Sequence, residues 1–463
     1  MTRLEQRPVY HAFDVFRAGF QAALSARVGD HLERLKWDRT RIEALQRDRL
    51  RGLLAIAIER SPFHARRLSG IDPDTFELGD LARLPVMSKA EMMAAFDDVT
   101  TDRRLTRAAA DDAIGSTTTV PRPIDGELLV LASGGSSGAR GLFGFDVAAF
   151  AEYAASILRP AMARRSAGGG PPSGPLAIVA ASSAIHATGA APALLAGTPL
   201  AFESVPVTQS LDEIVARLNE LRPAVLYGYP SMLVVLAGEQ AAGRLHISPA
   251  SVTANSEALH EAHRRAIRDA FGVPVVNSYG SSEGLVGASA PDERTITFAS
   301  DCCIAELVDE HDALVSAGTT SSAVLVTNLF NTVQPLIRYR LEDRLTQRPT
   351  AETEHLHADV EGRAATIFEY GDVSIHPLVL ATSLTRHPNV LDYQVRQSDR
   401  GVLIDVITTG AVDTAGLSAE LVAALADAGC TDPTAEIRVV PALARDSHTG
   451  KVAQFVPVVS ASC

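Results

Sequence analysis

The segment around which this chain is organised reads Leu131-Ala-Ser-Gly-Gly-Ser-Ser-Gly-Ala-Arg-Gly141. Residues 132–141 hold four glycines and three serines, so the segment is not a packing element. Glycine leaves the backbone free to turn and serine adds hydroxyl donors. Such a loop can therefore point several N–H and O–H groups at one anion, usually a phosphate. A flexible linker has the same composition, so the rest of the chain has to decide between the two.

Comparison with common loop motifs does little to decide between a phosphate-binding loop and a flexible linker. The Walker pattern fails because the loop contains no lysine, and the dinucleotide fingerprint finds no fit. The nucleophile-elbow pattern G-x-S-x-G fits twice, with Ser136 central in 134–138 and Ser282 central in 280–284. Two matches in one chain show how permissive this pattern is. A serine hydrolase that uses Ser136 or Ser282 remains an alternative from a different class.

Length and composition indicate a globular protein of two or three domains. The chain has 463 residues, is 46% hydrophobic and 21% charged, and carries a net charge of −13. This acidity argues against nucleic acid or an anionic membrane as the main partner. The start lacks an apolar signal core, and the apolar region 175–203 is broken by Pro, Gly, Ser and His. We therefore expect a cytoplasmic protein with no membrane-spanning segment.

The cysteines give no clear metal or disulfide pattern. They are Cys302, Cys303, Cys430 and Cys463, and none forms a C-x-x-C pair. A vicinal pair is a poor disulfide framework, which fits a reducing cytoplasm. A zinc site made of Cys302, Cys303 and His260 or His263 is conceivable, but the usual ligand spacing is absent. Whether Cys302 and Cys303 bind a metal is left open.

Hydrophobic periodicity predicts α/β layers over much of the chain. Predicted helices cover 39–60, a short segment after Ser88, 146–165, a segment after Ser210 and 256–271, and predicted strands cover 175–181, 223–228, 273–277 and 323–328. Ser88 with Glu91, and Ser210 with Glu213, are capping boxes that open helices. Strands that alternate with helices at this spacing indicate a parallel sheet. Residues 103–127 read as irregular, and 299–345 as β-structure.

The last hundred residues read as a separate unit. We expect strands at 365–370, 390–397, 402–408 and 435–440, and helices at 377–386 and 416–428. This β-α-β-β-α-β order is the ferredoxin-like motif. The boundary falls near Gly362-Arg363.

Four further segments carry polar residues typical of a binding site. They are 276–284, which ends a strand and contains Glu283; 335–344, where arginines and acids alternate with apolar residues; 361–363 at the domain boundary; and 444–451, a polar loop with Lys451. Each has a plain structural explanation when it stands alone: a capped turn, a salt-bridged strand edge, a linker and a solvated loop. Their order along the chain carries more information than any one of them.

In this order the segments resemble the acyl-adenylate-forming superfamily, and most closely its phenylacetate–CoA ligase branch. That branch has a Ser/Gly loop, then Y-G-x-T-E, P-x-I-R-Y-R-T-x-D, G-R-x-D-D and a late G-K. The matching segments here are 134–138, 279–283, 335–343, 362–363 and 450–451. The N-terminal part also looks like this branch, through Gln46, 61–64, 71–73 and Leu84-Pro85 before Lys89. The resemblance runs from about residue 35 to Lys451.

The resemblance implies an α/β fold in two domains. Residues 1–362 would form a large N-terminal adenylate-forming domain of α/β layers plus β-structure, and 363–463 a small, mobile C-terminal ferredoxin-like α+β domain carrying the catalytic lysine. The implied reaction is ATP-dependent activation of an aromatic or small organic acid to an acyl-adenylate, with release of pyrophosphate and transfer to a thiol. ATP and Mg²⁺ would be required, and the thiol would belong to CoA or an acyl carrier protein. The oligomeric state is open, with a homodimer among the alternatives.

The resemblance also assigns roles to matched positions. Lys451 would neutralise charge between the carboxylate and the α-phosphate, Ser282 would bond the α-phosphate, and Glu283 would hold Mg²⁺. The residues expected to bind ATP are Ser133, Gly134, Gly135, Ser136, Ser137, Gly138, Arg140, Ser256, Glu257, Asn277, Ser278, Tyr279, Gly280, Asp343 and Arg363. Within this set, Asp343 would accept the ribose hydroxyls with Arg363 nearby, and Tyr279 would pack beside the adenine. The acid pocket would be lined by His186, Tyr229, Asn255, Ser256 and Gly280.

Three departures from the family pattern bear on the acceptor. Ala139 and Arg140 stand where the family has lysine and proline, so Arg140 would have to supply the cation. Ala365 stands where the family has Asp or Lys two residues after the G-R arginine, and 370–372 lacks the usual R-G. The adenylation half-reaction is therefore better supported than thioester formation. An amine or another non-thiol acceptor, and a nucleotide-binding relative without catalysis, are the remaining alternatives.

Overall fold

The structure is a computed structural model. It describes residues 7–133, 141–167, 174–180, 183–207, 209–349, 355–363, 368–371, 373–375, 380, 383–384, 387, 389–445 and 452–458. The first part of the chain is helical, with α1 (Arg7–Arg34), α2 (Arg39–Arg60), α3 (Pro62–Arg67), α4 (Lys89–Ala94), α5 (Phe96–Val99), α6 (Arg107–Ser116) and two 3-10 turns, η1 (Pro73–Thr75) and η2 (Leu78–Arg83). Among the described residues, no helix has the length and apolar character needed to cross a bilayer.

Local sequence signals explain most of these helix starts. The carboxylate of Asp38 accepts the Arg41 N–H at 2.9 Å and starts α2, which covers the predicted span 39–60. The capping boxes at Ser88 and Ser210 are confirmed, because each serine and the glutamate three residues later bond one another's backbone N–H. The irregular reading of 103–127 was wrong for α6. Thr106 caps that helix, a weaker signal because no acidic residue completes a box.

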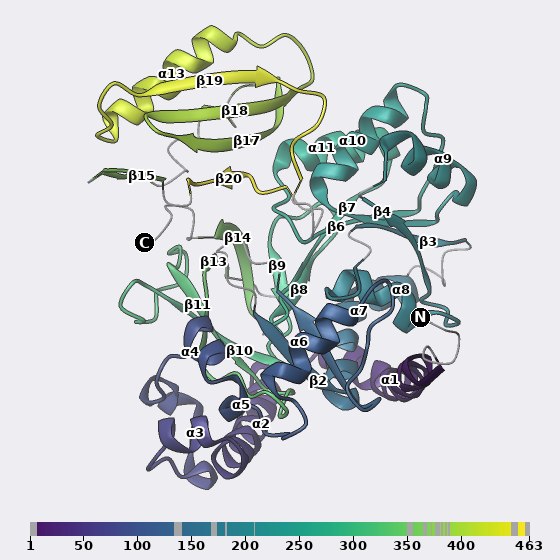
Figure 1. Ribbon diagram of the computed structural model, residues 1–463, viewed down its shortest axis with the longest axis vertical. Helices are drawn as coiled ribbons and strands as arrows, with labels where there is room; N and C mark the ends of the chain where they lie inside the picture. Colours follow the sequence, from purple (N-terminus) through teal and green to yellow (C-terminus); the bar gives the residue numbers. More distant parts are fainter. Residues whose placement is uncertain are drawn as a thin grey trace.

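The described residues between 7 and 363 are called the large part below. A nine-stranded mixed sheet forms their centre (Figure 1). Its strand order is β13-β14-β9-β8-β7-β6-β5-β3-β4. The bounds are β3 (Leu176–Ala180), β4 (Phe202–Pro206), β5 (Val225–Gly228), β6 (Ser251–Asn255), β7 (Val275–Gly280), β8 (Val286–Ser289), β9 (Ile296–Phe298), β13 (Asp343–Gln347) and β14 (His357–Arg363). Strands β3 to β7 are parallel, as predicted, and the remaining pairs are antiparallel.

Helices connect the parallel strands and cover both faces of the sheet. They are α7 (Val147–Ala167), α8 (Ala187–Leu195), α9 (Leu211–Leu221), α10 (Pro230–Ala241) and α11 (Glu261–Phe271). Helices α10 and α11 share one apolar core with Leu226 of β5 and Val252 of β6. Because side chains alternate along a strand, Gly280 of β7 lies on the opposite face, where α7 packs.

Two smaller sheets complete the large part. Strands β1 (Leu128–Ala132) and β2 (Leu142–Asp146) form an antiparallel pair around the glycine–serine loop. Strands β10 (Cys303–Val308), β11 (Ala323–Asn328) and β12 (Tyr339–Leu341) form a three-stranded antiparallel sheet, which confirms β-structure in 299–345.

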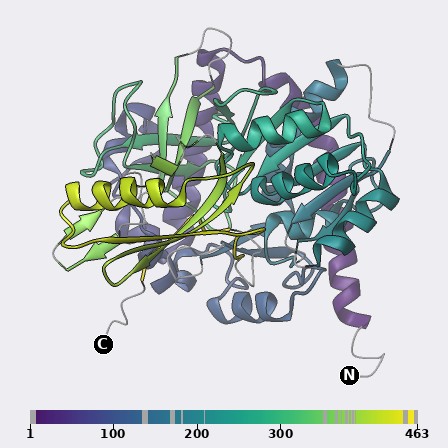
Figure 2. The same ribbon diagram turned by 90° about the horizontal axis from the view of Figure 1, so that it is seen from above.

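Residues from Phe368 onward form sheets and an apolar core of their own. Strands β17 (Val390–Ser398), β18 (Gly401–Thr408), β19 (Thr434–Val439) and β20 (Phe455–Val456) pair in the order β19-β18-β17-β20, and α13 (Thr414–Asp427) packs on β19. This unit, yellow-green at the top of Figure 1, meets α11 through β17, and Figure 2 shows it from above. Residues 363–463 as a separate mobile domain remain a prediction.

The ferredoxin-like order is seen only in part. The strand predicted at 365–370 is β15 (Phe368–Tyr370), and it pairs with β16 (Val373–Ile375) instead of joining the four-stranded sheet. The helix predicted at 377–386 lies largely outside the described residues. The β-β-α-β portion from β17 to β19 matches the expectation, and the complete motif stays a prediction.

Replacing Gly401 with alanine is expected to destabilise the C-terminal unit. A Cβ at this position would lie 1.9 Å from the backbone oxygen of Thr434 in the neighbouring strand β19, so the two strands would have to separate. Overpacking of this kind costs about 1–3 kcal/mol of unfolding free energy, measurable by urea or thermal denaturation. Gly238→Ala is the matched control, since no atom of the described residues outside its own helix backbone lies within 4 Å of the added Cβ. Equal midpoints for the two variants would contradict the prediction.

Candidate active site

The carboxyl ends of β5, β6 and β7 lie side by side at one edge of the parallel sheet. Gly228 at the end of β5 lies opposite Ala254, and Asn255 at the end of β6 lies opposite Ser278 in β7. In open α/β sheets, ligands bind outside the carboxyl ends of the strands. The predicted site residues that the structure brings to this edge are Tyr229, Asn255, Ser256, Glu257, Asn277, Ser278, Tyr279 and Gly280.

The end of β7 leaves space against α7. Among the described residues, a Cβ added at Gly280 would meet only Ile157 Cδ1 and Tyr153 Oη, both at 4.0 Å. On the same face of the sheet, Oδ1 of the buried Asn255 has no hydrogen-bond partner among the described residues. Because a buried polar atom normally has a partner, this oxygen points to a ligand or a water. The atoms beside Gly280 are thus one aliphatic carbon and one phenol oxygen.

The turn after β7 is held in a fixed conformation. Leu285 N donates to Ser281 Oγ at 3.2 Å, and Asn328 Nδ2 donates to the backbone carbonyl of Glu283 at 2.9 Å. Gly284 has a φ of +108°, and an added Cβ would lie 2.2 Å from Asn328 Nδ2, so only glycine fits. These contacts bury Glu283 at the sheet edge. Burial, and then the carboxylate of Glu283, raise the pKa of the Tyr153 phenol, which stays neutral.

The turn architecture corrects one alternative. A nucleophile elbow needs a strand, a sharp turn and a helix. The segment 280–284 instead joins β7 to the antiparallel strand β8. Ser282 is therefore not on an elbow, and the serine hydrolase reading of this match was wrong. The other match, around Ser136, lies outside the described residues.

Ser133 and Gly141 are the two ends of the glycine–serine loop, called the loop stem below, and they bond to each other. Ser133 N donates to Gly141 O at 2.9 Å, and Gly141 N donates to Ser133 Oγ at 3.0 Å. His186, the residue before α8, lies with Nδ1 2.9 Å from Ala132 O. This contact places His186 at the loop stem, and its predicted place in the acid pocket remains untested. Of the predicted phosphate-binding residues, Gly134, Gly135, Ser136, Ser137, Gly138 and Arg140 lie outside the described residues.

The predicted ribose residues come together. Asp343 begins β13 and lies opposite Arg363, which ends β14. Asp343 is buried. Tyr279 packs edge-on against Phe298, with ring centroids 5.3 Å apart. The structure thus gathers segments from four separate parts of the sequence in the large sheet.

Comparison with known proteins supports one family. Models of protein families give no match. The phenylacetate–coenzyme A ligase of Thermus thermophilus is 27% identical over 389 residues, which cover 79% of this chain and 80% of the relative. The phenylacetate–coenzyme A ligase of Escherichia coli is 25% identical over 383 residues, covering 78% of this chain and 80% of the relative.

Over about four fifths of its length, the chain is similar to phenylacetate–CoA ligases, which are acyl-adenylate-forming enzymes. The fold agrees. A crystal structure of 2-hydroxyisobutyryl-CoA ligase in its postadenylation state, bound to an acyl-AMP, superposes with a TM-score of 0.66. It is 18% identical and covers 92% of this chain and 91% of its own.

In this phenylacetate–CoA ligase-like chain, the arginines of 335–344 have structural partners. Arg338 has a φ of +49° and is buried; its Nε donates to Glu306 Oε2 at 3.0 Å and its Nη1 to Leu84 O at 2.6 Å. Burial raises the pKa of Glu306, and the charge of Arg338 counters this. Arg340 pairs with Asp312. Arg338 therefore fastens the N-terminal helical part to the β10-β11-β12 sheet, and Arg340 of β12 pairs with the connection between β10 and β11, as expected for a salt-bridged strand edge.

Glu257, which is predicted to bind ATP, contacts two backbone N–H groups of the chain. Its Oε2 accepts Ser231 N at 3.1 Å, and its Oε1 accepts Val452 N at 2.8 Å. Both carboxylate oxygens are thus engaged by the chain's own backbone. The helix predicted over 256–271 begins only at Glu261, because residues 256–260 form an irregular turn in which Ser256 has a φ of +65°.

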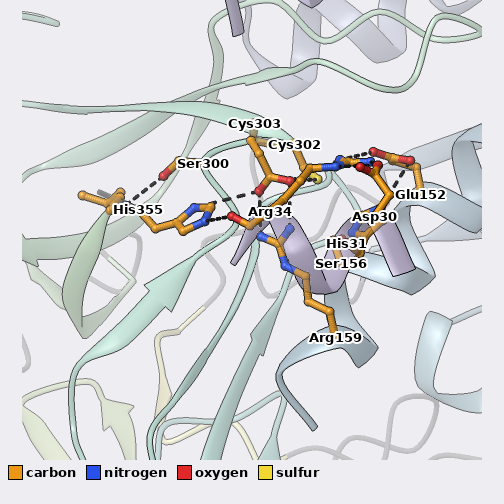
Figure 3. Close-up of polar contacts among 12 residues, drawn as sticks. Asp30, His31, Arg34, Glu152, Ser156, Arg159, Ser300, Cys302, Cys303 and His355 are labelled. Atoms are coloured by element: carbon orange, nitrogen blue, oxygen red, sulfur yellow. Dashed lines mark hydrogen bonds and ion pairs between the residues drawn. The ribbon is translucent and has the colours of Figure 1, made fainter. Parts of the chain in front are cut away.

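Cys302 and Cys303 lie beside a cluster of buried charged residues (Figure 3). Asp301 accepts two bonds from Arg159, at 2.8 and 2.6 Å, and one from Arg34 at 3.2 Å. Burial favours a raised pKa for Asp301, but the charge and hydrogen bonds of Arg159 outweigh it and hold the pKa below its ordinary value. Burial raises the pKa of the Cys302 thiol.

This cluster corrects the zinc alternative. His260 and His263 lie at α11 beside the C-terminal unit, so they do not join Cys302 and Cys303. The histidine close to Cys302 is His31, and these two groups with Asp301 offer ligand atoms within 4.8 Å of one another. Two guanidinium groups already occupy Asp301, which makes this a poor site for a cation. Sequence inspection gave no signal for the cluster, because its members come from α1, α7 and the segment before β10.

Proposed function

We propose that this protein joins a carboxylic acid to AMP, using ATP and releasing pyrophosphate, and then transfers the acyl group to the thiol of CoA. The observation that carries the proposal is that the ends of β6 and β7 lie side by side, with the fixed Glu283 turn directly after β7, in a chain with phenylacetate–CoA ligase relatives. The enzyme class is an ATP-dependent acid–thiol ligase, since the relatives named phenylacetate–CoA ligase match most of this chain.

The chemistry requires positioning and charge compensation. A carboxylate oxygen of the acid attacks the α-phosphorus, the new P–O bond forms, and pyrophosphate leaves with the electron pair of the broken bond. The glycine–serine loop would hold the β- and γ-phosphates, and Ser282 would bond the α-phosphate. Asp343 would accept the ribose hydroxyls. Lys451, which lies outside the described residues, would compensate charge between the carboxylate and the phosphate.

The Glu283 carboxylate is suited to bind a magnesium ion. It is a buried carboxylate on a turn whose backbone is fixed by Asn328. Mg²⁺ takes one or two carboxylates together with phosphate oxygens. When bound, Mg²⁺ would offset the negative charge of the triphosphate.

The acid would lie between β7 and α7. The space beside Gly280 is bounded by Ile157 and Tyr153, and the unpartnered Asn255 Oδ1 faces the same side. The aliphatic side chain of Ile157 suits an aromatic or small apolar acid.

A non-thiol acceptor is the second candidate, favoured by two sequence features. Ala365 replaces the acidic or basic residue of the family pattern, and 371–372 reads Gly-Asp. An amine would attack the same acyl carbon and release the same AMP, so the adenylation site would be unchanged.

Pyrophosphate release with a panel of acids tests the proposal. We expect release that depends on ATP, Mg²⁺ and one class of acid, with arylacetic and benzoic acids tried beside short aliphatic acids. Adding CoA should then yield a thioester detectable by mass spectrometry. Acid-dependent pyrophosphate release without a thioester would point to the amine-type acceptor. The ligase proposal fails if no acid supports release.

A further inference from the structure

The segment 452–454, directly after Lys451, lies between the two parts of the molecule. On one side, Val395 N of β17 donates to Gln454 O at 2.8 Å. Gln394 Nε2 donates to the carbonyls of Ala444 at 3.1 Å and Ala453 at 2.9 Å, so one side chain ties both stems of the lysine loop to β17. On the other side, the segment contacts residues 257–260 of the large part.

One carboxylate makes the central contact on that side. Glu257 Oε1 accepts Val452 N at 2.8 Å, while Oε2 accepts Ser231 N at the start of α10 at 3.1 Å. The side chain is 9% exposed, and Arg445 Nη1 lies 4.0 Å away. Hydrogen bonds to an ionised acceptor are about twice as strong as neutral ones. Glu257 therefore joins α10 to the residue that follows Lys451.

Two histidines of the same region add contacts with the C-terminal unit. Gln454 and His260 form a hydrogen bond, with His260 Nε2 lying 3.0 Å from Gln454 Nε2 and 3.2 Å from Gln454 Oε1. Burial lowers the pKa of His260 to about 4, so this ring is neutral at pH 7 and can accept the bond. His263 Nε2 lies 3.4 Å from Asp392 Oδ1 of β17, and both side chains are buried. The contacts of Glu257, His260 and His263 run along one edge of the large part.

The backbone before Glu257 shows that this arrangement is specific. Ser256 has a φ of +65°, in the left-handed region that residues other than glycine seldom adopt. Residues 256–260 do not continue α11, although the sequence pattern is helical there. Strain of this kind persists only where surrounding contacts fix it. Here the bent turn directs the Glu257 carboxylate toward Val452 and Ser231.

We propose that Glu257 is a positioning residue that docks the Lys451 loop onto the large part for acyl-adenylate formation. The inference rests on the proposed function, because it assumes that Lys451 acts in that step. Glu257 holds the backbone one residue from the lysine and touches no reacting atom. The transfer of the acyl group from a finished adenylate to a thiol needs no cation between carboxylate and α-phosphate. Loss of Glu257 should therefore slow the first half-reaction selectively.

The test uses Glu257→Gln and Glu257→Ala in the full-length chain. Glutamine offers one acceptor oxygen for two N–H donors, so Glu257→Gln keeps part of the contact. Glu261→Gln is the matched control, since Glu261 begins α11 just after the turn that holds Glu257 and pairs only with Arg264, at 3.6 Å, among the described residues. Hydrogen–deuterium exchange of the 452–458 peptide measures docking directly. Pyrophosphate exchange measures adenylation, and synthetic acyl-adenylate plus CoA measures transfer.

We expect faster exchange of the 452–458 peptide in both Glu257 variants and no change in Glu261→Gln. The kcat of adenylation should fall about tenfold to a hundredfold in Glu257→Ala, with a smaller loss in Glu257→Gln, as for a lost charge-assisted bond. Transfer from synthetic acyl-adenylate should stay within about twofold, since this step uses no such contact. Unchanged exchange, or equal losses in both half-reactions, would overturn the proposal. If the wild-type chain activates no acid, the proposed function fails, whereas the exchange experiment still tests the docking contact.

Discussion

Replacing Lys451 with alanine is expected to slow acyl-adenylate formation by about 10²–10³-fold, as for loss of a charge-stabilising group in other active sites. The proposed step brings a carboxylate against a phosphate, and a compact ammonium group compensates that charge. The rarity of lysine in this chain supports the role assigned to Lys451. The chain has 42 lysines and arginines, of which only Lys36, Lys89 and Lys451 are lysines. A chain that otherwise relies on arginine places a lysine at the position where the family pattern has one.

The measurement is acid-dependent ATP–pyrophosphate exchange, with ATP binding followed separately. Lys451→Arg keeps the charge on a larger, planar group, so we expect only partial recovery. Lys36→Ala is the control, because Lys36 is exposed and follows the end of α1. The melting temperature of Lys451→Ala should match that of the wild type. Adenylation at the wild-type rate in Lys451→Ala would show that another group supplies the charge.

Replacing Asp301 with alanine is expected to lower the free energy of unfolding by about 3–5 kcal/mol, the usual effect of breaking a buried ion pair. Asp301 is fully buried and accepts bonds from Arg159 and Arg34, which are 3% and 5% exposed. Without the carboxylate, Arg159 would stay buried with no countercharge beside it. The loss should be global, because Arg34 belongs to α1, Arg159 to α7 and Asp301 to the segment before β10.

Urea denaturation of the full chain measures this effect. Asp14→Ala is the matched control: Asp14 pairs with Arg17 at 2.9 Å on the surface, with the Asp14 side chain 58% exposed. Exposed pairs contribute about 0–1 kcal/mol. Comparable stability losses in Asp301→Ala and Asp14→Ala would mean that the cluster adds no net stability.

Capping signals in the local sequence correctly predicted where two helices start. The serine–glutamate boxes at Ser88 and Ser210 start helices where expected, because each bond forms within one turn and needs no distant partner. Of the parallel strands, β3, β5 and β7 were predicted from their apolar runs, whereas β4 and β6 were missed. Helix α6 was missed because its Thr106 cap has no acidic partner, and α11 begins late because Glu257 bonds to Ser231 and Val452 instead of continuing a helix.

The residues of the candidate site also fall into two groups: those that the sequence predicted and those whose contacts only the structure shows. Tyr279, Gly280 and Glu283 were identified by their motif, and the structure places them at the strand end where a ligand is expected. The second G-x-S-x-G match could be rejected only after the structure showed an antiparallel strand following Ser282. The partner of Glu257 was beyond prediction, because Val452 lies almost two hundred residues away in the sequence.

The sequence by itself determined the family resemblance, the α/β frame and the order of the segments proposed to bind ATP. These properties depend on residue types and on short spacings between residues, and both can be seen in the sequence without knowledge of the fold. Only the tertiary structure decided which buried charges pair, which cysteine lies near which histidine, and which carboxylate holds the segment next to Lys451. Those contacts join residues from separate elements, and their free energy depends on burial and exact distance, neither of which is encoded in local spacing.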